Sequence, residues 1–182
     1  MNIIVAITGA SGAIYARQVL DILANSEEVT RVALVLSDHA HDVVEAEGVT
    51  LPQSEKVELF SNDDMWSSLA SGSARWDAMI VVPCSMGTVG RIASGVSRTL
   101  IERAADVMLK ERRKLVTVVR EAPYSLIHLR NLTTITEAGA IVVPASPSFY
   151  LQPKSIEELA LTISQRAVEM LTIEVNHRSW GE

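Results

Sequence analysis

The sequence predicts an α/β layer sandwich, in which helices cover both faces of a mostly parallel sheet. Short runs of β-branched residues alternate with helical patterns along the whole chain. The strongest runs are apolar throughout, which is typical of strands that are buried on both faces. Two of these runs end in turns of small residues that lead directly into helices. Because the chain has 182 residues, we expect a single domain over residues 1–182 with a full hydrophobic core.

The first predicted strand continues into a turn and a helix. Residues 3–7 read I-I-V-A-I, residues 8–12 read T-G-A-S-G, and residues 13–24 carry apolar side chains at helical spacing. Such a turn leaves unpaired N–H groups at the start of a helix, where the helix dipole attracts an anion. The turn therefore indicates either a phosphate site, to which Ser11 adds a hydroxyl, or a tight strand-to-helix connection that binds nothing.

The next segments are less uniform. A second buried strand is predicted at 32–36, followed by a helix that Asp38 caps and that runs to about Glu47. Residues 50–60 alternate apolar and polar residues around a proline, which indicates a short edge strand plus loop. Residues 61–76 are rich in Ser, Asp, Gly and Trp, and we interpret them as a long loop of the kind that often has a function.

A second small-residue turn follows the third strong strand. Residues 78–82 are apolar, and the sequence P-C-S-M-G-T at 83–88 again leads into a helix. A further helix is predicted at 100–110 and a strand at 115–119. Two small-residue turns are thus expected at carboxyl ends of strands.

The remaining pattern completes the alternation. Residues 125–137 are helical by pattern, residues 140–143 are the last strand, and residues 144–153 form a proline-punctuated loop. A capping-box pattern at 155–158 begins a long final helix.

Polar side chains gather at one predicted edge of the sheet. In an open parallel sheet, ligands bind outside the carboxyl ends of the strands. The residues expected there are Ser11, Ser37, Ser85, Arg120 and the loop that carries Phe149 and Tyr150. Their convergence predicts a binding site, since each residue alone also occurs in ordinary loops.

Composition excludes several classes of function. A net charge of −6 and a pI near 5.3 argue against nucleic acid as the partner, although a local basic pocket for a phosphorylated small molecule is compatible with both. The single cysteine, Cys84, allows no intrachain disulfide and fits a reducing compartment. We find neither a signal peptide nor an apolar stretch long enough to span a membrane, so we expect a cytoplasmic protein.

Arg120 and Glu121 are the strongest candidates for chemistry, because two charges directly follow a buried strand. They form either a solvated ion pair or a functional pair in which Arg120 holds an anion and Glu121 carries a proton. Cys84 has no evident base beside it, which favours a buried small side chain over a nucleophile.

No metal site is expected. His39 and His41 are two residues apart in a predicted helix and therefore point away from each other. Asp63 and Asp64 lack the further aspartate of a magnesium–diphosphate site. The charged run at 110–114 is most simply a solvated helix end, or in a homo-oligomer a source of side chains for a neighbour's ligand.

Taken together, the motifs resemble those of the UbiX-type flavin prenyltransferases, formerly described as aromatic acid decarboxylases. The resemblance covers nearly the whole chain. Its motifs are T-G-A-S-G-A at 8–13, A-S-G-S at 70–73, P-C-S-M-G-T at 83–88, E-R-A-A-D-V-x-L-K-E-R-R at 102–113, R-E-A-P at 120–123 and F-Y-x-x-P at 149–153. Together these ordered motifs are highly specific.

The resemblance implies a three-layer αβα, Rossmann-like (flavodoxin-like) flavoprotein. Such an enzyme transfers a dimethylallyl group from dimethylallyl phosphate to N5 and C6 of reduced FMN, without metal. Its product, prenylated FMN, is the cofactor of UbiD-type decarboxylases, which serve ubiquinone biosynthesis or aromatic acid decarboxylation. Similar proteins are homododecamers, so the resemblance also implies sites shared between subunits.

The resemblance also assigns residues. The implied FMN contacts are Gly9, Ala10, Ser11, Ser37, Ser85, Met86, Gly87, Thr88 and Arg120. The implied substrate residues are Tyr150, Arg166, Arg103, Ser71, Lys110 from an adjacent subunit and Glu47 approaching from a neighbour. The implied catalytic residues are Glu121 as the acid/base, Ser11 at the leaving phosphate and Tyr150 as a π-rich wall beside the allylic cation. Trp66 is the alternative for this wall, but it is offset by one position from the aromatic residue of the family pattern.

Two other functions remain open at this point. A flavin-dependent cysteine decarboxylase has a similar first turn, but it uses a His and an Asn-containing motif that are not found at 83–88. A non-catalytic flavin carrier or accessory subunit would not need the charged residues that are retained here.

Overall fold

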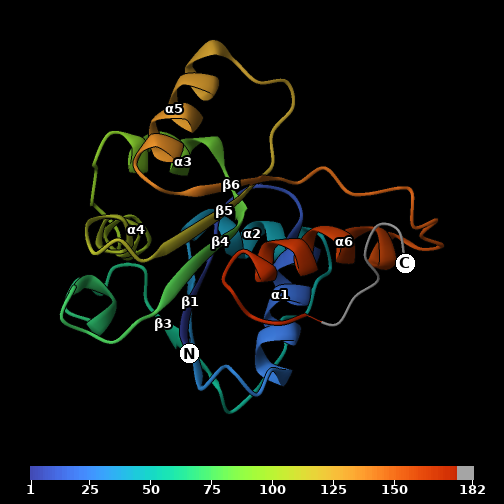
Figure 1. The fold of residues 1–182 in the computed structure, drawn as a ribbon, viewed down its shortest axis with the longest axis horizontal. Helices are drawn as coiled ribbons and strands as arrows, with labels where there is room; N and C mark the ends of the chain where they lie inside the picture. The colour runs from blue at the N-terminus through green and yellow to red at the C-terminus, as the bar shows by residue number, and fades with distance from the viewer. Residues whose placement is uncertain (176–182) are drawn as a thin grey trace.

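The computed structural model describes residues 1–175 and contains a six-stranded sheet in which every strand pairs in parallel, in the order β3-β2-β1-β4-β5-β6 (Figure 1). The elements follow one another as β1 (Asn2–Ile7), α1 (Ala13–Asn25), β2 (Arg31–Leu36), α2 (Asp38–Ala46), β3 (Val57–Phe60), the short helix η1 (Ser68–Ala70), β4 (Ala78–Cys84), α3 (Met86–Ala93), α4 (Leu100–Lys110), β5 (Lys114–Val119), α5 (Leu126–Glu137), β6 (Ile141–Pro144) and α6 (Ile156–Glu169).

Helices cover both faces of the sheet, because alternate residues of a buried strand point to opposite faces. In β1, Ile3 and Val5 pack with side chains of α1, α2 and α6. Ile4 and Ala6, which lie between and beside them in the chain, pack instead with side chains of α3, α4 and α5. The sheet therefore separates α6 from α4, and Figure 1 shows the two helices on opposite sides of the strands.

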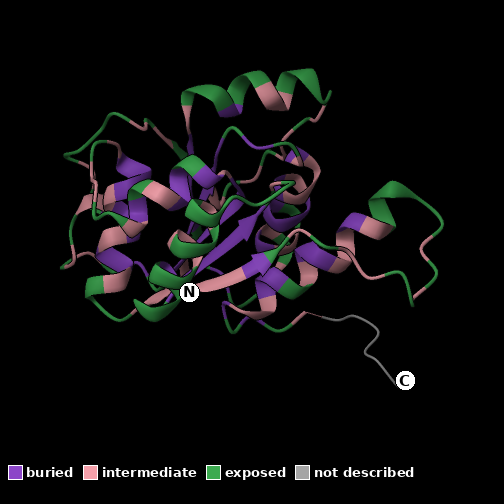
Figure 2. Cartoon of the chain, turned by 90° about the horizontal axis from the view of Figure 1, so that it is seen from above, coloured by how far each residue is buried: buried purple, intermediate pink, exposed green. Residues whose placement is uncertain are grey.

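The apolar runs form the core. The strands β1, β2 and β4 occupy the centre of the sheet and are almost entirely buried, which Figure 2 shows as the purple interior. The edge strand β3 is more open, with Leu59 67% exposed. Because central parallel strands must be apolar on both faces, they were the easiest elements to recognise in the sequence.

The predicted α/β layer sandwich is confirmed, with local differences. Its sheet is entirely parallel. The N-cap of α2 is Ser37, and Asp38 lies in the first turn, where a carboxylate favours the helix dipole. The predicted cap at Asp38 is therefore wrong by one residue. The long loop at 61–76 contains the η1 turn. At the start of α6, Ser155 accepts from the Glu158 amide, whereas the Glu158 carboxylate accepts from the Lys154 amide instead of that of Ser155.

Among residues 1–175, no helix combines the length and the apolar character that crossing a bilayer requires.

Candidate functional site

The two small-residue turns lie side by side, and Thr8 joins them. The Thr8 hydroxyl donates to the Pro83 carbonyl oxygen at 2.8 Å and accepts from the Ser85 amide at 2.8 Å. Thr8 is only 2% exposed, so these hydrogen bonds are shielded from water. The first turn and the start of α3 are thereby held as one unit at the carboxyl ends of β1 and β4.

This unit lies where the order in which the chain adds strands to the sheet reverses. The chain runs from β1 to β2 on one side and to β4 on the other, which is the switch point where ligands of open α/β sheets bind. Gly9 allows a close approach there, since a Cβ at Gly9 would lie 2.6 Å from the Cβ of His39. A side chain at position 9 would push the first turn away from α2.

A cavity of about 530 Å³ opens at the switch point. Its walls carry hydroxyl groups and two guanidinium groups. Of the predicted FMN contacts, Gly9, Ser37, Ser85, Gly87 and Thr88 line it. Ser85 caps α3, because its hydroxyl accepts from the Thr88 amide at 3.3 Å. Hydroxyls and cations around a helix N-terminus suit a phosphorylated ligand.

The cavity also contains charged residues that the sequence analysis did not select. Glu102, 3% exposed, accepts from Arg91 Nε at 2.5 Å and from the amides of Arg98 and Thr99. Arg91 in turn donates to the Thr88 hydroxyl at 3.3 Å. The spacing of Thr99 and Glu102 fits a capping box, so the sequence could have shown that Glu102 caps the start of α4. It could not have shown that the same carboxylate reaches Arg91 of α3.

A second cluster surrounds the start of α1. The Glu47 carboxylate accepts from the Gly12 amide at 2.9 Å and from the Ala13 amide at 2.7 Å. This contact is made within one chain, and the approach of Glu47 to a neighbouring subunit's site stays a prediction. Glu47 thus occupies the N–H groups that the first turn was predicted to offer to an anion.

Electrostatics link this cluster to Arg120. Burial acts to raise the pKa of Glu47, but hydrogen bonds from Ser11, Gly12 and Ala13 and the charge of Arg120 outweigh it, so the pKa is lowered. Burial raises the pKa of Tyr15, an effect that Arg120 opposes and Glu47 reinforces. Arg120 is therefore within electrostatic reach of both groups.

Arg120 and Glu121 follow β5 as predicted. The Arg120 amide donates to the Cys84 carbonyl oxygen at 3.2 Å, which fixes the pair beside the second turn. Glu121 is partly exposed, and its carboxylate accepts from the Ala122 amide at 3.0 Å. Cys84 is fully buried and burial raises its pKa to about 12, so the thiolate needed for a nucleophile is not formed at neutral pH.

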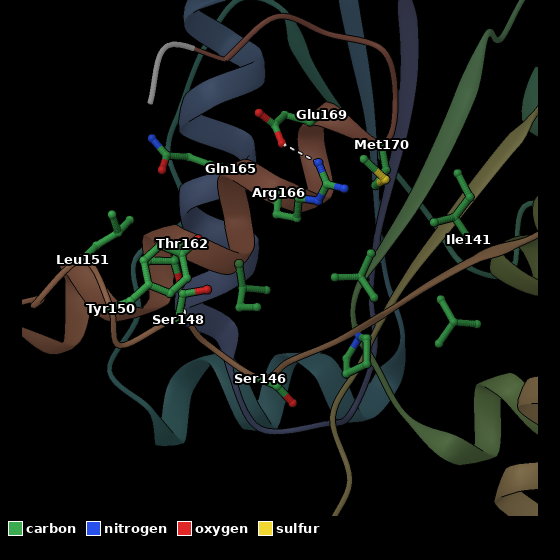
Figure 3. A pocket seen from close by; sticks show the side chains of 14 residues that line it. Ile141, Ser146, Ser148, Tyr150, Leu151, Thr162, Gln165, Arg166, Glu169 and Met170 are labelled. Carbon is green, nitrogen blue, oxygen red and sulfur yellow. Dashed lines mark hydrogen bonds and ion pairs between the residues drawn. The ribbon is translucent and has the colours of Figure 1, made fainter. Parts of the chain in front are cut away.

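The residues predicted to hold the prenyl donor are divided between two places. Tyr150 and Arg166 line a cavity of about 690 Å³ between β6, the loop that follows it and α6 (Figure 3). Arg166 Nη1 pairs with Glu169 at 3.1 Å. The Ser148 amide donates to the Thr162 hydroxyl at 3.1 Å and so ties the loop to α6.

Ser71, Arg103 and Lys110 lie elsewhere, beside α4 on the other face of the sheet. Arg103 Nε donates to the Ala70 carbonyl oxygen at 3.0 Å, and Lys110 pairs with Glu111. One chain therefore does not bring these three residues to Tyr150 and Arg166. Trp66 stands on the same loop as Ser71 and is 99% exposed.

The histidines of α2 do not converge. His39 lies 3.8 Å from the carboxylate of Asp42, one turn further along the helix. Within residues 1–175, no group of three or more His, Cys, Asp or Glu side chains is arranged to hold a metal ion.

Comparison with known proteins places the chain in a family. The Flavoprotein family model matches residues 1–173. The chain is 42% identical to flavin prenyltransferase UbiX of Methanocaldococcus jannaschii, with 100% of this chain and 99% of that protein aligned.

Two solved structures agree. AnUbiX (PadA1) in complex with FMN and dimethylallyl pyrophosphate superposes with a TM-score of 0.89 at 40% identity, over 98% of each chain. The dodecameric FMN-dependent UbiX-like decarboxylase of Escherichia coli O157:H7 superposes with a TM-score of 0.92 at 36% identity, over 100% of each chain. The fold, the two turns at the switch point and the full-length similarity lead to one conclusion: the chain belongs to the UbiX flavin prenyltransferase family.

Proposed function

We propose that this protein is a flavin prenyltransferase, which transfers the dimethylallyl group of dimethylallyl phosphate to N5 and C6 of reduced FMN. The observation that carries the proposal is the hydroxyl-lined cavity at the switch point, in a chain that aligns over its full length with enzymes of this name. We propose that a UbiD-type decarboxylase receives the product, prenylated FMN, as its cofactor.

The cavity at the switch point fits FMN. Ser37, Ser85 and Thr88 offer hydroxyl groups, and the first turn of α3 offers unpaired amides to a phosphate. The absence of a side chain at Gly9 lets the first turn pack directly against His39 of α2, which also lines the cavity. These features suit a planar ligand with a phosphorylated tail.

Bound reduced FMN supplies the electron-rich ring that accepts the allylic carbon. The protein's own groups position the reactants, stabilise the leaving phosphate and carry one proton. Arg120 supplies positive charge beside the second turn, and Ser11 supplies a hydroxyl at the first once the phosphate replaces Glu47 as its acceptor. We assign the proton to Glu121, which lies one residue beyond Arg120 and is partly exposed.

The prenyl donor site is proposed to lie between subunits. Tyr150 and Arg166 are on the α6 face of the sheet, whereas Lys110 and Arg103 are on the α4 face. A second copy that brings its α4 to the first chain's α6 would complete a cationic site for a phosphate. The dodecameric state of the similar E. coli protein supports a homo-oligomer.

The proposal includes a cytoplasmic location and a reaction that needs no metal. A chain with one cysteine, Cys84, needs no oxidising compartment for its folding. Arginine and lysine side chains can stabilise a phosphate leaving group in the role that a metal ion takes in other enzymes.

Mass spectrometry tests the proposal directly. The protein is incubated anaerobically with reduced FMN and dimethylallyl phosphate in the presence of a chelator, and the molecular mass of the released flavin is measured. We expect a mass gain of one dimethylallyl unit. Flavin that is bound but unmodified would overturn the proposal in favour of a carrier or a decarboxylase.

The variant Glu121→Gln tests the assigned proton carrier. It should retain FMN binding and lose most of the turnover, because an amide cannot exchange a proton. Glu137→Gln, at the exposed end of α5, is the matched control and should behave as the wild type. Equal turnover in the two variants would remove Glu121 from the mechanism.

A further inference from the structure

The segment Ala70–Ala74, which carries Ser71, is held by arginine side chains. Arg113 Nη2 donates to the Gly72 carbonyl oxygen at 2.7 Å, and Arg113 Nη1 donates to the Ala74 carbonyl oxygen at 3.0 Å. Together with the bond from Arg103 to Ala70 at 3.0 Å, every second carbonyl of this segment receives a guanidinium N–H. The segment pairs with no strand, and these guanidinium donors add to the few hydrogen bonds that it makes locally.

Arginine suits this task better than other residues. Its guanidinium is a rigid planar fork that can serve two acceptors at once, whereas the ammonium of lysine is a single point on a flexible stem. The base of Arg113 is itself fixed, because its amide donates to the Met108 carbonyl oxygen at 2.8 Å and β5 begins at the next residue. The guanidinium of Arg113 therefore fixes the segment relative to the start of β5.

The two hydrogen bonds from Arg113 determine where the Ser71 hydroxyl lies. Ser71 Oγ is 2.9 Å from Ser73 Oγ, and the Ser71 carbonyl oxygen accepts from the Ala74 amide at 3.2 Å. Both contacts close a tight turn whose outer carbonyls, at Gly72 and Ala74, are the ones that Arg113 holds. Releasing them would let the turn open and the Ser71 hydroxyl rotate away.

The same turn touches Lys110. A Cβ at Gly72 would lie 2.6 Å from Lys110 Nζ and 2.2 Å from Glu111 Oε1, so the lysine–glutamate pair packs directly on the glycine. The hydrogen bond and the charge of Lys110, together with the charge of Arg113, lower the pKa of Glu111 and keep it ionised at neutral pH. Glu111 thereby holds the Lys110 ammonium beside the turn.

We propose that Arg113 is a positioning residue of the prenyl donor site: its fork holds the 70–74 turn so that Ser71 and Lys110 meet the phosphate of an allylic phosphate monoester together. This inference rests on the proposed function and adds to it a residue that does not itself touch the substrate.

The test compares Arg113→Gln with Arg113→Lys and with Arg112→Gln, using the full-length oligomer. Losing a charged hydrogen-bond donor changes affinity by about tenfold, so we expect Arg113→Gln to raise KM for dimethylallyl phosphate about tenfold while kcat and the Kd of FMN stay within about twofold. Arg113→Lys should recover part of the loss. Arg112 is exposed and adjacent, and its variant should match the wild type. An unchanged KM in Arg113→Gln, or an equal rise in Arg112→Gln, would overturn the inference.

A double-mutant cycle separates positioning from general destabilisation. If Arg113 acts through Ser71, then Arg113→Gln should raise KM much less in a Ser71→Ala background than in the wild type, since the hydroxyl to be positioned is already gone. Additive effects would contradict the inference. Should Arg113→Gln fail to fold, Gly72→Ala offers a second approach: its methyl group would displace the Glu111 carboxylate and the end of Lys110, and it should also raise KM. An unchanged KM there would count against the shared turn.

The two proposals fail in different ways. If the wild-type protein forms no prenylated flavin, then the proposed function fails. If the wild type turns over and the Arg113 variants do so with the same KM, then only the positioning role fails.

Discussion

At the scale of single residues, Glu47 shows how a carboxylate can take the place of an anionic ligand. It accepts from the Gly12 and Ala13 amides at the start of α1, where no side chain of the N-cap residue does so. Because the helix dipole favours a negative charge at this end, the carboxylate is stabilised in its ionised form.

The variant Glu47→Gln measures this stabilisation. A lowered folded-state pKa means that the carboxylate contributes stability above its unfolded pKa and loses it as the pH falls through the folded value. We expect a destabilisation of about 0.5 kcal/mol at pH 7, since the group is largely exposed and screened. The difference from the wild type should shrink below pH 4.5, the ordinary value for this side chain. Urea titrations at several pH values check it, with Glu45→Gln on the same helix as the control. A difference that stayed constant at low pH would contradict the assignment.

Cys84 provides a second prediction at this scale. Burial raises its pKa to about 12, an effect that Arg91 opposes. At pH 8 only about 10⁻⁴ of the thiol is ionised, so a disulfide reagent should modify the folded protein very slowly and the unfolded protein at once. A spectrophotometric thiol assay with and without denaturant measures both rates. Rapid modification of the folded protein would show that the site opens.

How far the site could be predicted depended on where its residues stand in the chain. Ser37 and Ser85 directly follow apolar strands, so the pattern that located the strands also located these hydroxyls. Arg91 and Glu102 lie inside helical patterns and meet only because α3 packs against α4. A single sequence carries no signal for that meeting, since it depends on the angle between two helices.

At the scale of elements, α6 is joined to α1 by a buried polar link. Gln18 Nε2 donates to the Glu157 carbonyl oxygen at 2.8 Å, and Gln18 Oε1 accepts from the Ser164 hydroxyl at 2.9 Å. Gln18 is 7% exposed. Water therefore does not readily replace it, and a partner that lost its hydrogen bond to Gln18 would reduce the stability of the fold. The link fixes α6, and with it Arg166, relative to the first turn.

Replacing Gln18 by Met should therefore destabilise the protein by about 1–2 kcal/mol, because the Glu157 carbonyl oxygen would lose its donor while the volume of the side chain is kept. Urea unfolding measures the change. Asp21→Asn, one turn further along the exposed side of α1, should leave the midpoint unaltered. A loss below about 0.3 kcal/mol in Gln18→Met would show that water replaces the link.

The elements themselves were largely predictable because the local and global patterns agree. The helix at 100–110 was predicted with the bounds that α4 has, since its apolar stripe, charged start and basic end all indicate one helix. The start of α2 was misplaced by one residue because Ser37 and Asp38 both favour a cap. There the choice is made by tertiary contact: the Ser37 amide donates to the Ile7 carbonyl oxygen of the neighbouring strand.

At the scale of the whole molecule, α5 leaves large apolar side chains uncovered. Ile135 is its only buried residue, while Leu126, Ile127 and Leu129 are 61%, 68% and 48% exposed. Together with Tyr124 they form an apolar patch of the kind that marks an interface between proteins. The proposed homo-oligomer provides an occupant for it, namely a second copy of the chain.

The variant Ile127→Glu should weaken this assembly without unfolding the subunit, because a carboxylate in an apolar interface must be desolvated. Sedimentation velocity should show smaller species, and circular dichroism should be unchanged. Thr136→Glu, on the opposite side of α5 by helical period, serves as the control. Assembly that withstands Ile127→Glu would place the interface elsewhere.

The separation of α4 from α6 by the sheet has a genetic consequence. If each site takes Arg166 from one copy and Lys110 from another, then two inactive alleles, one altered at each position, can complement each other within a mixed oligomer. Random mixing in equal amounts would leave about a quarter of the sites with both native side chains. Two variants that are inactive separately would then regain activity when they are refolded together.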